Sequence, residues 1–254
     1  MRVIHISETD SYQAAVKAIR THPILVQLPT VYVLLAPATA AGASWLDQAK
    51  QRQPNKNYGT AIGDVEQFRR MVTPGTLPHE LDRAQGLNVL TGAFIRCTVA
   101  PSDYDSVMVR GGTHQGVLLP GPQRDLFTVL EASLDDMADP SIVAGHHYTA
   151  PLCTSCNISG DPDGSIVEWS RARQFALDRD IPLVITSEAA TGQAGSYPIF
   201  ALSANAARIE RQGPRMDELK AALPARLFAS ENGHANGAAA RSWLAAALDG
   251  ATNG

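Results

Sequence analysis

The chain has 254 residues, of which 44% are hydrophobic and 18% charged, so it can bury a sizeable core and is not a disordered chain. Its net charge of -4 argues against nonspecific attraction to nucleic acid or to an anionic membrane as its main role. No apolar run approaches the ~20 residues of a membrane-spanning helix, and the first ten residues lack a secretory pattern, so we expect a cytoplasmic protein. Three cysteines are few for a chain of this length and an odd number, which argues against a disulfide framework, so we expect reduced thiols.

Strand and helix patterns alternate along the whole chain. In chain order, the spacing of apolar residues predicts a strand at 2–6, a helix at 12–19, a strand at 23–28, a helix at 44–50, a strand at 59–63, a helix at 65–72, strands at 88–99 and 105–110, a helix at 124–134, an extended segment at 151–154, a helix at 166–176, strands at 181–186 and 197–202, and helices at 216–223 and 238–248. Asp10 and Asp64 are candidate helix caps, and Pro29 ends the strand at 23–28 because proline has no N–H to donate. This mixture predicts an α/β (α+β) fold, with a mixed sheet covered by helices. We expect one domain at 1–224, then a flexible linker around 230–237 and a short helix within 225–254.

Two cations follow the predicted helix at 44–50. In an extended chain, residues two apart point to the same side, so Lys50 and Arg52 can converge on one anion. That arrangement suits a polyphosphate, and the alternative is a solvated basic helix end.

Two further segments carry polar groups next to predicted strands. Ser155 and Asn157 have the same two-residue spacing and can both offer hydrogen bonds to a ligand at a strand end, or they can simply form a turn before Gly160. Arg110 follows an apolar run and could bind phosphate or carboxylate, with His114 as a second contact, unless it is only a surface arginine.

A metal site is a weaker hypothesis. A zinc ion would accept two imidazoles and two thiols, which occur together at His146, His147, Cys153 and Cys156. Adjacent histidines point in different directions, however, so idle cysteines are favoured, and we expect no protein-bound metal. Walker loops, Gly-x-Ser-x-Gly elbows and His-Glu-x-x-His motifs do not occur.

In their order, these fragments resemble the YrdC-like family, which includes the threonylcarbamoyl-AMP synthases, over about residues 10–223. The most specific match is Thr154 to Gly160, which differs from the family's Thr-Ser-Ala-Asn-Ile-Ser-Gly only at Cys156. The other matching parts are Leu28-Pro29-Thr30-Val31-Tyr32, Lys50 with Arg52, Arg110 with His114, Gly195-Ser196, and Arg211-Gln212-Gly213.

The resemblance implies an open, twisted sheet around a concave cavity that binds ATP with Mg²⁺. There, bicarbonate and an amino-acid or amine acceptor would be joined and adenylated to a carbamoyl-type AMP, with release of pyrophosphate. By resemblance, Lys50 and Arg52 are the catalytic residues, and the nucleotide is held by Lys50, Arg52, Ser155, Asn157, Ser196 and Arg211. The acyl and acceptor side would be faced by Thr30, Tyr32, Arg110 and His114.

The chain departs from the family pattern mainly on the acceptor side. The Asp-Thr of the family loop is missing between Thr30 and Val31, the glycine after the tyrosine is Val33, and Gly112 replaces a proline. We therefore expect a nucleotidyltransferase whose acceptor is not threonine, with a downstream partner that receives the carbamoyl group.

Three alternatives to this function remain open. The first is threonylcarbamoyl-AMP synthesis for transfer-RNA modification, and the second is a nucleotide- or RNA-binding module without catalysis. The negative net charge counts against direct RNA binding. The third is the zinc-dependent enzyme.

Overall fold

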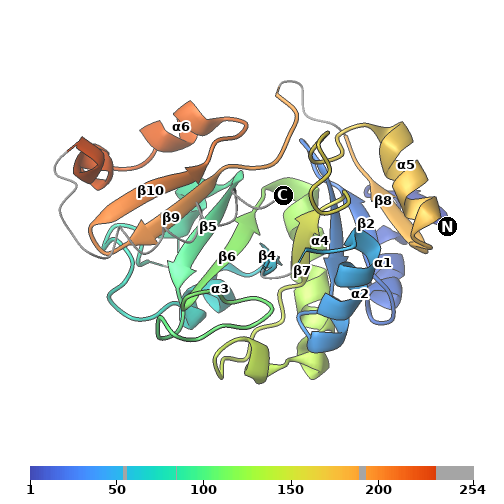
Figure 1. Ribbon diagram of the computed structural model, residues 1–254, viewed down its shortest axis with the longest axis horizontal. Coiled ribbons are helices and arrows are strands. Elements are labelled where there is room, and N and C mark those ends of the chain that lie inside the picture. Colours follow the sequence, from blue (N-terminus) through green and yellow to red (C-terminus); the bar gives the residue numbers. More distant parts are fainter. Residues whose placement is uncertain (54–55, 84, 189–192, 233–254) are drawn as a thin grey trace, which may run out of the picture.

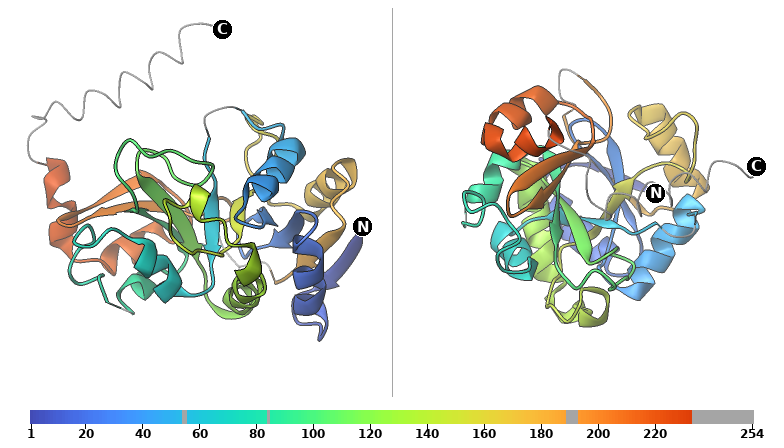
Figure 2. Two further views of the ribbon diagram at one scale, coloured as in Figure 1. Left: turned by 90° about the horizontal axis from the view of Figure 1, so that it is seen from below. Right: turned by 60° about the vertical axis from the view of Figure 1, so that its left-hand side comes forward.

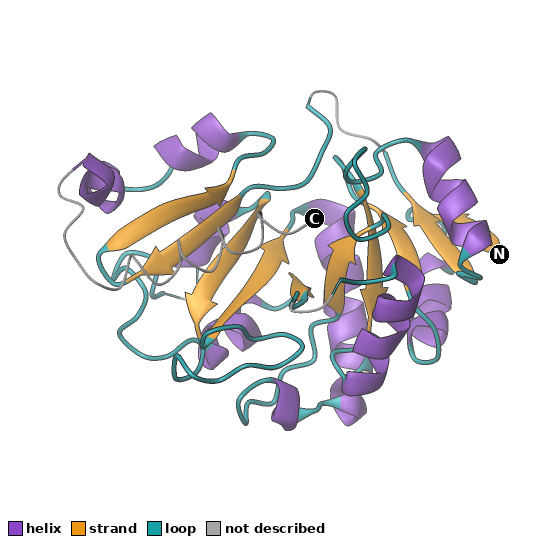
Figure 3. Cartoon of the chain, viewed as in Figure 1, coloured by secondary structure: helices purple, strands orange, loops and turns teal. Residues whose placement is uncertain are grey.

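One twisted sheet runs through the whole molecule (Figures 1 and 3). The structure is a computed structural model that describes residues 1–53, 56–83, 85–188 and 193–232. Ten strands in the described residues form the sheet, in the order β1-β8-β2-β3-β7-β4-β6-β5-β9-β10. Their bounds are β1 Arg2–His5, β2 Ile24–Gln27, β3 Tyr32–Ala36, β4 Gly59–Ile62, β5 Ala93–Thr98, β6 Thr113–Leu118, β7 Leu152–Ser155, β8 Leu183–Thr186, β9 Ile199–Ser203 and β10 Ala206–Arg211.

Helices cover both faces of the sheet. The α-helices are α1 Ser11–Ile19, α2 Ala40–Lys50, α3 Val65–Met71, α4 Gly121–Ser133, α5 Trp169–Asp178 and α6 Met216–Ala221, and short 3₁₀ turns occur at Gly86–Leu90, Asp135–Met137, Pro140–Ile142 and Ala225–Asn232. None of the helices in the described part is long and apolar enough to cross a bilayer. Figure 2 shows α6 beside the β9–β10 hairpin and α5 at the opposite end of the sheet.

Two hydrophobic cores lie on the two faces of the sheet. Helices α1 and α4 pack over one face, and α2, α3, α5 and α6 pack over the other. This division follows from strand alternation: on β3, Val33 belongs to the first core and Leu34 to the second. The mixed sheet covered by helices is therefore confirmed.

The centre of the sheet is antiparallel and positions the segments that matter below. Strand β7 pairs with β3, placing Ser155 opposite Val33 and Cys153 opposite Leu35. On its other side, β7 pairs with β4, where Gly59 lies opposite Cys153. A Cβ on Gly59 would come within 2.9 Å of the Phe94 ring, so glycine allows that ring to lie over β4.

Most predicted elements are confirmed with small shifts of their ends, but the predicted strand at 105–110 is wrong. Met108 and Val109 are fully buried there, yet they lie in a loop in which the Ser106 hydroxyl accepts hydrogen bonds from both of their N–H groups, at 3.1 and 3.0 Å. The apolar run at 105–110 therefore reflects the burial of Met108 and Val109 and not pairing with another strand. The first part of the predicted strand at 88–99 is also wrong, since Gly86–Leu90 is a 3₁₀ turn before β5.

Three strands are absent from the predictions: β3, β6 and β10. Pro29 does end β2, but the chain turns back at once, with the Leu28 N–H donating to the Val31 carbonyl at 2.9 Å. Asp64 caps α3 by accepting from the Glu66 N–H, as predicted. Asp10 is the N-cap residue of α1, as predicted, but its carboxylate pairs with Arg2 and makes no capping hydrogen bond. Leu227 is fully buried, so the packed chain continues past residue 224, and the predicted helix at 238–248 lies outside the described residues.

A buried carboxylate joins α4 to the start of α3. Glu131 Oε2 accepts hydrogen bonds from the N–H groups of Gly63, at 2.9 Å, and Asp64, at 2.7 Å. Its other oxygen, Oε1, has no hydrogen-bond partner within the described part of the chain. Burial raises the pKa of Glu131 from 4.5 to about 7, with smaller opposing effects of the two backbone donors.

This raised pKa makes stability depend on pH. The folded state holds the Glu131 proton more tightly than the unfolded state, so the stability gained is complete below pH 4.5 and is lost as the pH rises through about 7. Glu131→Gln keeps an oxygen acceptor and removes the charge. Between those two pH limits, we expect the unfolding free energy of the wild type to fall relative to this variant by about 3 kcal/mol, at ~1.4 kcal/mol per pKa unit. Chemical denaturation of both proteins across this range measures the difference, and parallel pH profiles would contradict the assignment.

Candidate functional site

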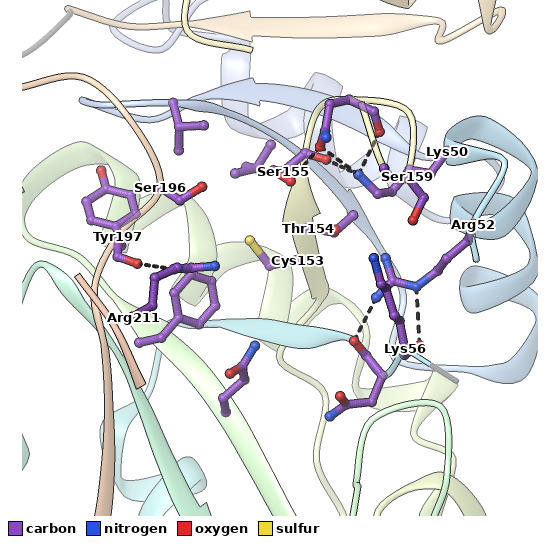
Figure 4. Close-up of a pocket in the computed structure, with 17 residues that line it drawn as sticks. Lys50, Arg52, Lys56, Cys153, Thr154, Ser155, Ser159, Ser196, Tyr197 and Arg211 are labelled. Carbon is purple, nitrogen blue, oxygen red and sulfur yellow. Dashed lines mark hydrogen bonds between the residues drawn. The ribbon is translucent and has the colours of Figure 1, made fainter. Parts of the chain in front are cut away.

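A cavity of about 280 Å³ opens beside the carboxyl end of β7 (Figure 4). Four cationic side chains line it, Lys50, Arg52, Lys56 and Arg211, and no Asp or Glu among the described residues does so. Since the whole chain carries a net charge of -4, this local excess of positive charge indicates a site for an anion.

Lys50 is the last residue of α2 and is almost completely buried at 3% exposure. Its Nζ donates to the carbonyls of Ser155, at 2.5 Å, and Asn157, at 2.7 Å, and to Asn157 Oδ1 at 3.1 Å. These three acceptors can engage all three ammonium protons. Burial, and then the nearby charge of Arg52, lowers the pKa of Lys50 from 10.5 to about 8.

The segment after β7 is a tight turn tied to the end of α2. Ser155 Oγ donates to Asn157 Oδ1 at 2.7 Å, and the Ser159 N–H donates to the Lys50 carbonyl at 2.9 Å. Gly160 has a φ of 87°, in the left-handed region that favours glycine. A Cβ there would also meet Gln53 Nε2 at 2.8 Å. The predicted pair Ser155 and Asn157 therefore lines the cavity. These hydrogen bonds and the left-handed Gly160 fix the conformation of the turn that carries the pair.

Arg52 reaches the same cavity by a different route from the one predicted. Gln51 has a φ of 47° and ends α2 in a left-handed turn, so residues 50–52 do not form the extended segment that the two-residue spacing assumed. Arg52 Nε donates to the Lys56 carbonyl at 3.2 Å and Nη2 donates to the Asn57 carbonyl at 2.7 Å. Burial lowers the pKa of Arg52.

The far side of the cavity comes from the C-terminal part of the described chain. Arg211 Nε donates to the Tyr197 carbonyl at 2.9 Å, and its guanidinium lies over the Phe94 ring at 5.5 Å. Burial lowers the pKa of Arg211. Ser196 also lines the cavity, with its hydroxyl 2.7 Å from that of Ser165. Figure 4 shows this group facing Lys50 and Arg52 across β7.

All six residues predicted on the nucleotide side thus line one cavity, whereas the four predicted on the acceptor side do not. Thr30 comes nearest, because its hydroxyl donates to the Gly195 carbonyl at 2.8 Å, next to Ser196. Tyr32 points to the other face of β3, where its ring lies 6.3 Å from that of Trp169. Arg110 is exposed and lines a neighbouring cavity of about 290 Å³, which shares Lys56 and Asn57 with the first.

His114 is a core residue in this structure. It is fully buried, with Nε2 2.9 Å from the Thr60 hydroxyl and Nδ1 3.0 Å from the Met108 carbonyl. Burial lowers its pKa from 6.5 to about 4, so the imidazole is neutral at physiological pH. Its neighbour on β6, Gln115, lines the cavity, because successive strand residues point to opposite faces.

Several residues of the cavity wall were not among those predicted to bind the nucleotide or the acceptor. These are Lys56, Asn57, Gln115, Thr154, Ser159, Gly160, Tyr197 and an apolar group formed by Val31, Val33, Phe94 and Cys153. Lys56 is a third cation within six residues of Lys50, and this local density of positive charge could have indicated that Lys56 belongs to the site. The apolar residues of the wall give no such indication, because their pattern is that of ordinary buried strand residues.

The predicted zinc ligands do not come together. Within the described ranges, no three His, Cys, Asp or Glu side chains are placed to hold one metal ion. Cys153 and Cys156 are buried, and burial raises the pKa of each thiol to about 12. His147 instead has its Nε2 3.5 Å from Asp135 Oδ1.

Magnesium would fit this cavity only as a companion of a phosphate ligand. Mg²⁺ prefers oxygen ligands and keeps several of its waters, and it is commonly held through substrate phosphates with one or two carboxylates. The described wall offers hydroxyl and carbonyl oxygens but no carboxylate. The phosphates themselves would therefore supply the charged ligands.

Anion binding at this cavity should weaken in alkaline solution. A polyphosphate favours the charged form of Lys50, whose pKa is about 8 without ligand. The affinity for the polyphosphate is therefore highest below pH 8 and declines as the pH rises through that value. Lys50→Met removes this titration. We expect calorimetric ATP affinity of the wild type to fall from about pH 7 to 9, and that of the variant to be weaker and flatter. An equally steep decline in the variant would show that another group titrates.

Comparison with known proteins supports the fold at low sequence identity. The chain matches no protein-family profile and no curated protein sequence. Sua5 from P. abyssi, crystallised with L-threonine, is similar with a TM-score of 0.68 and 15% identity, over 94% of this chain and 66% of that chain. HypF in a phosphate- and nucleotide-bound form gives a TM-score of 0.55 and 13% identity, over 79% of this chain and 28% of that chain.

A smaller structure is covered almost completely. E. coli YciO gives a TM-score of 0.56 and 12% identity, over 84% of this chain and 94% of that chain. The chain thus spans about two thirds of Sua5 and nearly all of YciO. At these identities the likeness concerns the fold, and it confirms the fold that the sequence resemblance implies. The protein has the YrdC-like fold shared by Sua5 and YciO.

Proposed function

We propose that the protein is an adenylate-forming enzyme that makes a carbamoyl-type AMP from ATP, bicarbonate and an amino acid or amine. The observation that carries this proposal is the cavity itself. Residues from the end of α2 and the segment after it, the turn after β7, and the segments around β9 and β10 meet there. They present four cations, and no carboxylate of the described chain lines the cavity. A structurally similar protein, HypF, has been crystallised with phosphate and a nucleotide, and Sua5 with L-threonine.

The reaction requires positioning and charge stabilisation more than covalent help from the protein. The amine nitrogen of the acceptor bonds to the carbon of bicarbonate, and loss of water leaves a carbamate. A carbamate oxygen then attacks the α-phosphorus of ATP, and the bond to the bridging oxygen breaks, so that pyrophosphate leaves with the electron pair. Negative charge grows on the phosphate oxygens, where fixed cations are most effective in a site that excludes water.

The residues divide this work. The guanidinium of Arg52 offers a planar fork of donors to phosphate oxygens. Lys50 keeps the turn after β7 in place and adds a buried positive charge. Arg211 contributes a further positive charge on the opposite side of β7, close to the apolar group formed by Val31, Val33, Phe94 and Cys153.

The acceptor side favours a compound other than threonine. The hydroxyl of Thr30 is already bonded to the Gly195 carbonyl, and Val31 and Val33 present hydrocarbon to the cavity. Hydrocarbon surface of this kind gains little from a substrate hydroxyl. Threonylcarbamoyl-AMP synthesis for transfer-RNA modification stays the second candidate, because the similar Sua5 structure contains L-threonine.

A nucleotide-binding module without catalysis is the third candidate. One observation favours it: protein carbonyls already engage both Lys50 and Arg52. Three protein oxygens can take all three ammonium protons of Lys50, so this residue adds positive charge to the wall but offers no direct hydrogen bond to a ligand.

One assay separates the three candidates. Purified protein is incubated with ATP, Mg²⁺, labelled bicarbonate and a panel of amino acids and amines, and pyrophosphate and the adenylate product are measured. We expect bicarbonate-dependent pyrophosphate release with an acceptor other than threonine. Release with threonine alone would instead support threonylcarbamoyl-AMP synthesis. ATP binding without turnover would support the binding module, and absence of ATP binding would contradict all three.

Replacing Arg52 should have the larger effect of two substitutions. Arg52→Ala leaves a phosphate without its charged partner in a partly desolvated site, and we expect a loss of about 2–5 kcal/mol in ATP binding. Ser155→Ala removes one neutral hydrogen bond to Asn157 and should cost about 0.5–1.5 kcal/mol. Arg52→Lys is the matched control, because it keeps the charge and loses the fork. Calorimetry with ATP gives all three values, and an unchanged affinity in Arg52→Ala would remove Arg52 from the site.

A further inference from the structure

Arg52 is held by more than its hydrogen bonds to the chain. Its guanidinium carbon lies 3.9 Å from the centre of the Tyr58 ring, a close stacking distance for a cation on an aromatic face. The same guanidinium donates through Nε and Nη2 to the carbonyls of Lys56 and Asn57. The ring therefore covers one face of the group, while the two carbonyls take one of its edges.

Tyr58 is itself fixed at both ends. It is buried at 2% exposure just before β4, and its N–H donates to the Val107 carbonyl at 2.7 Å. Its hydroxyl donates to Asp47 Oδ1 at 2.5 Å. Asp47 lies on α2, and its backbone carbonyl accepts the Arg52 N–H at 3.0 Å. The ring, the carboxylate and the backbone of Arg52 thus form one connected unit.

This unit leaves part of the guanidinium directed at the cavity. A guanidinium has five N–H donors, and protein carbonyls take two of those on Arg52. The other donors have no hydrogen-bond partner among the described residues, and Arg52 lines the cavity with its side chain extended toward β7 (Figure 4). An unsupported arginine samples many rotamers, whereas this one is restricted before any ligand arrives.

We infer that Tyr58 is a positioning residue, which acts through Arg52 by holding the free edge of the guanidinium toward the phosphate part of the ligand. This inference rests on the proposed function, because the phosphate belongs to the proposed ATP. Asp47 supports the ring through the tyrosine hydroxyl. Preorganising a cation in this way removes the entropy cost of ordering it at the moment of binding.

A double-mutant cycle tests the inference. Tyr58→Leu removes the ring, Tyr58→Phe keeps the ring and loses the bond to Asp47, and each is compared with Arg52→Ala and with the Arg52→Ala, Tyr58→Leu double variant. For a desolvated cation–aromatic contact, we expect Tyr58→Leu to weaken ATP binding by about 10- to 30-fold, and Tyr58→Phe by less than about 5-fold. The double variant should bind no worse than Arg52→Ala alone, within about 3-fold.

A merely structural tyrosine would behave differently. In that case the losses from Tyr58→Leu and Arg52→Ala would multiply, and such a result overturns the inference, as does an unchanged affinity in Tyr58→Leu. Tyr148 provides the matched control, since it is fully buried and its hydroxyl lies 2.9 Å from that of Thr60, and it does not line the cavity. Tyr148→Leu should lower stability and show no coupling to Arg52.

A second measurement needs no nucleotide. The Nε–H of Arg52, which donates to the Lys56 carbonyl, should give a protected NMR signal in the wild type and in Tyr58→Phe, and an exchange-broadened one in Tyr58→Leu. If the wild-type protein fails to bind ATP, the proposed function is wrong, and this signal still decides whether Tyr58 holds Arg52. A protected signal in Tyr58→Leu would overturn the positioning role.

Discussion

The set of hydrogen bonds made by the buried Lys50 ammonium is the interaction on which the rest of the site depends. It joins the end of α2 to a turn more than a hundred residues later, through the carbonyls of Ser155 and Asn157. A buried charge without partners is very unfavourable, so the fold must keep these oxygens in place. Because Lys50 is fixed, the turn after β7 and the left-handed residue Gln51 are fixed as well, and together they direct Arg52 into the cavity.

The electrostatics of the cavity are unbalanced until a ligand is present. Burial lowers the pKa of Lys50, Arg52 and Arg211, which means that each would be more stable in its charged form with an anion nearby. Elsewhere on the molecule many of the arginines pair with carboxylates, as Arg96 does with Glu210 at 2.8 Å. No carboxylate of the described cavity wall supplies this compensation, and in the proposed function the phosphates of ATP would supply it.

Residues in short local motifs could be placed from the sequence, whereas residues whose direction depends on strand pairing could not. The grouping of the six residues assigned to the nucleotide side around one cavity could be predicted, because they lie in short segments with a distinct local pattern, above all Thr154 to Gly160. The placement of the four residues assigned to the acceptor side could not. The direction of the Tyr32 side chain is set by strand β3. The sequence after Pro29 is a continuous apolar run, and such a run does not show whether the segment is a strand or another buried element. His114 was misjudged for the same reason, because β6 turns it into the core and turns Gln115 toward the cavity.

In the proposed function, the Lys50 end of the cavity holds the phosphates of a nucleotide. The most direct measurement is a crystal structure of the full chain with Mg²⁺ and a non-hydrolysable ATP analogue. We expect phosphate oxygens within hydrogen-bond distance of the free edge of Arg52 and of the turn that contains Ser155 and Asn157. A nucleotide bound elsewhere, or phosphates turned away from both groups, would contradict the account.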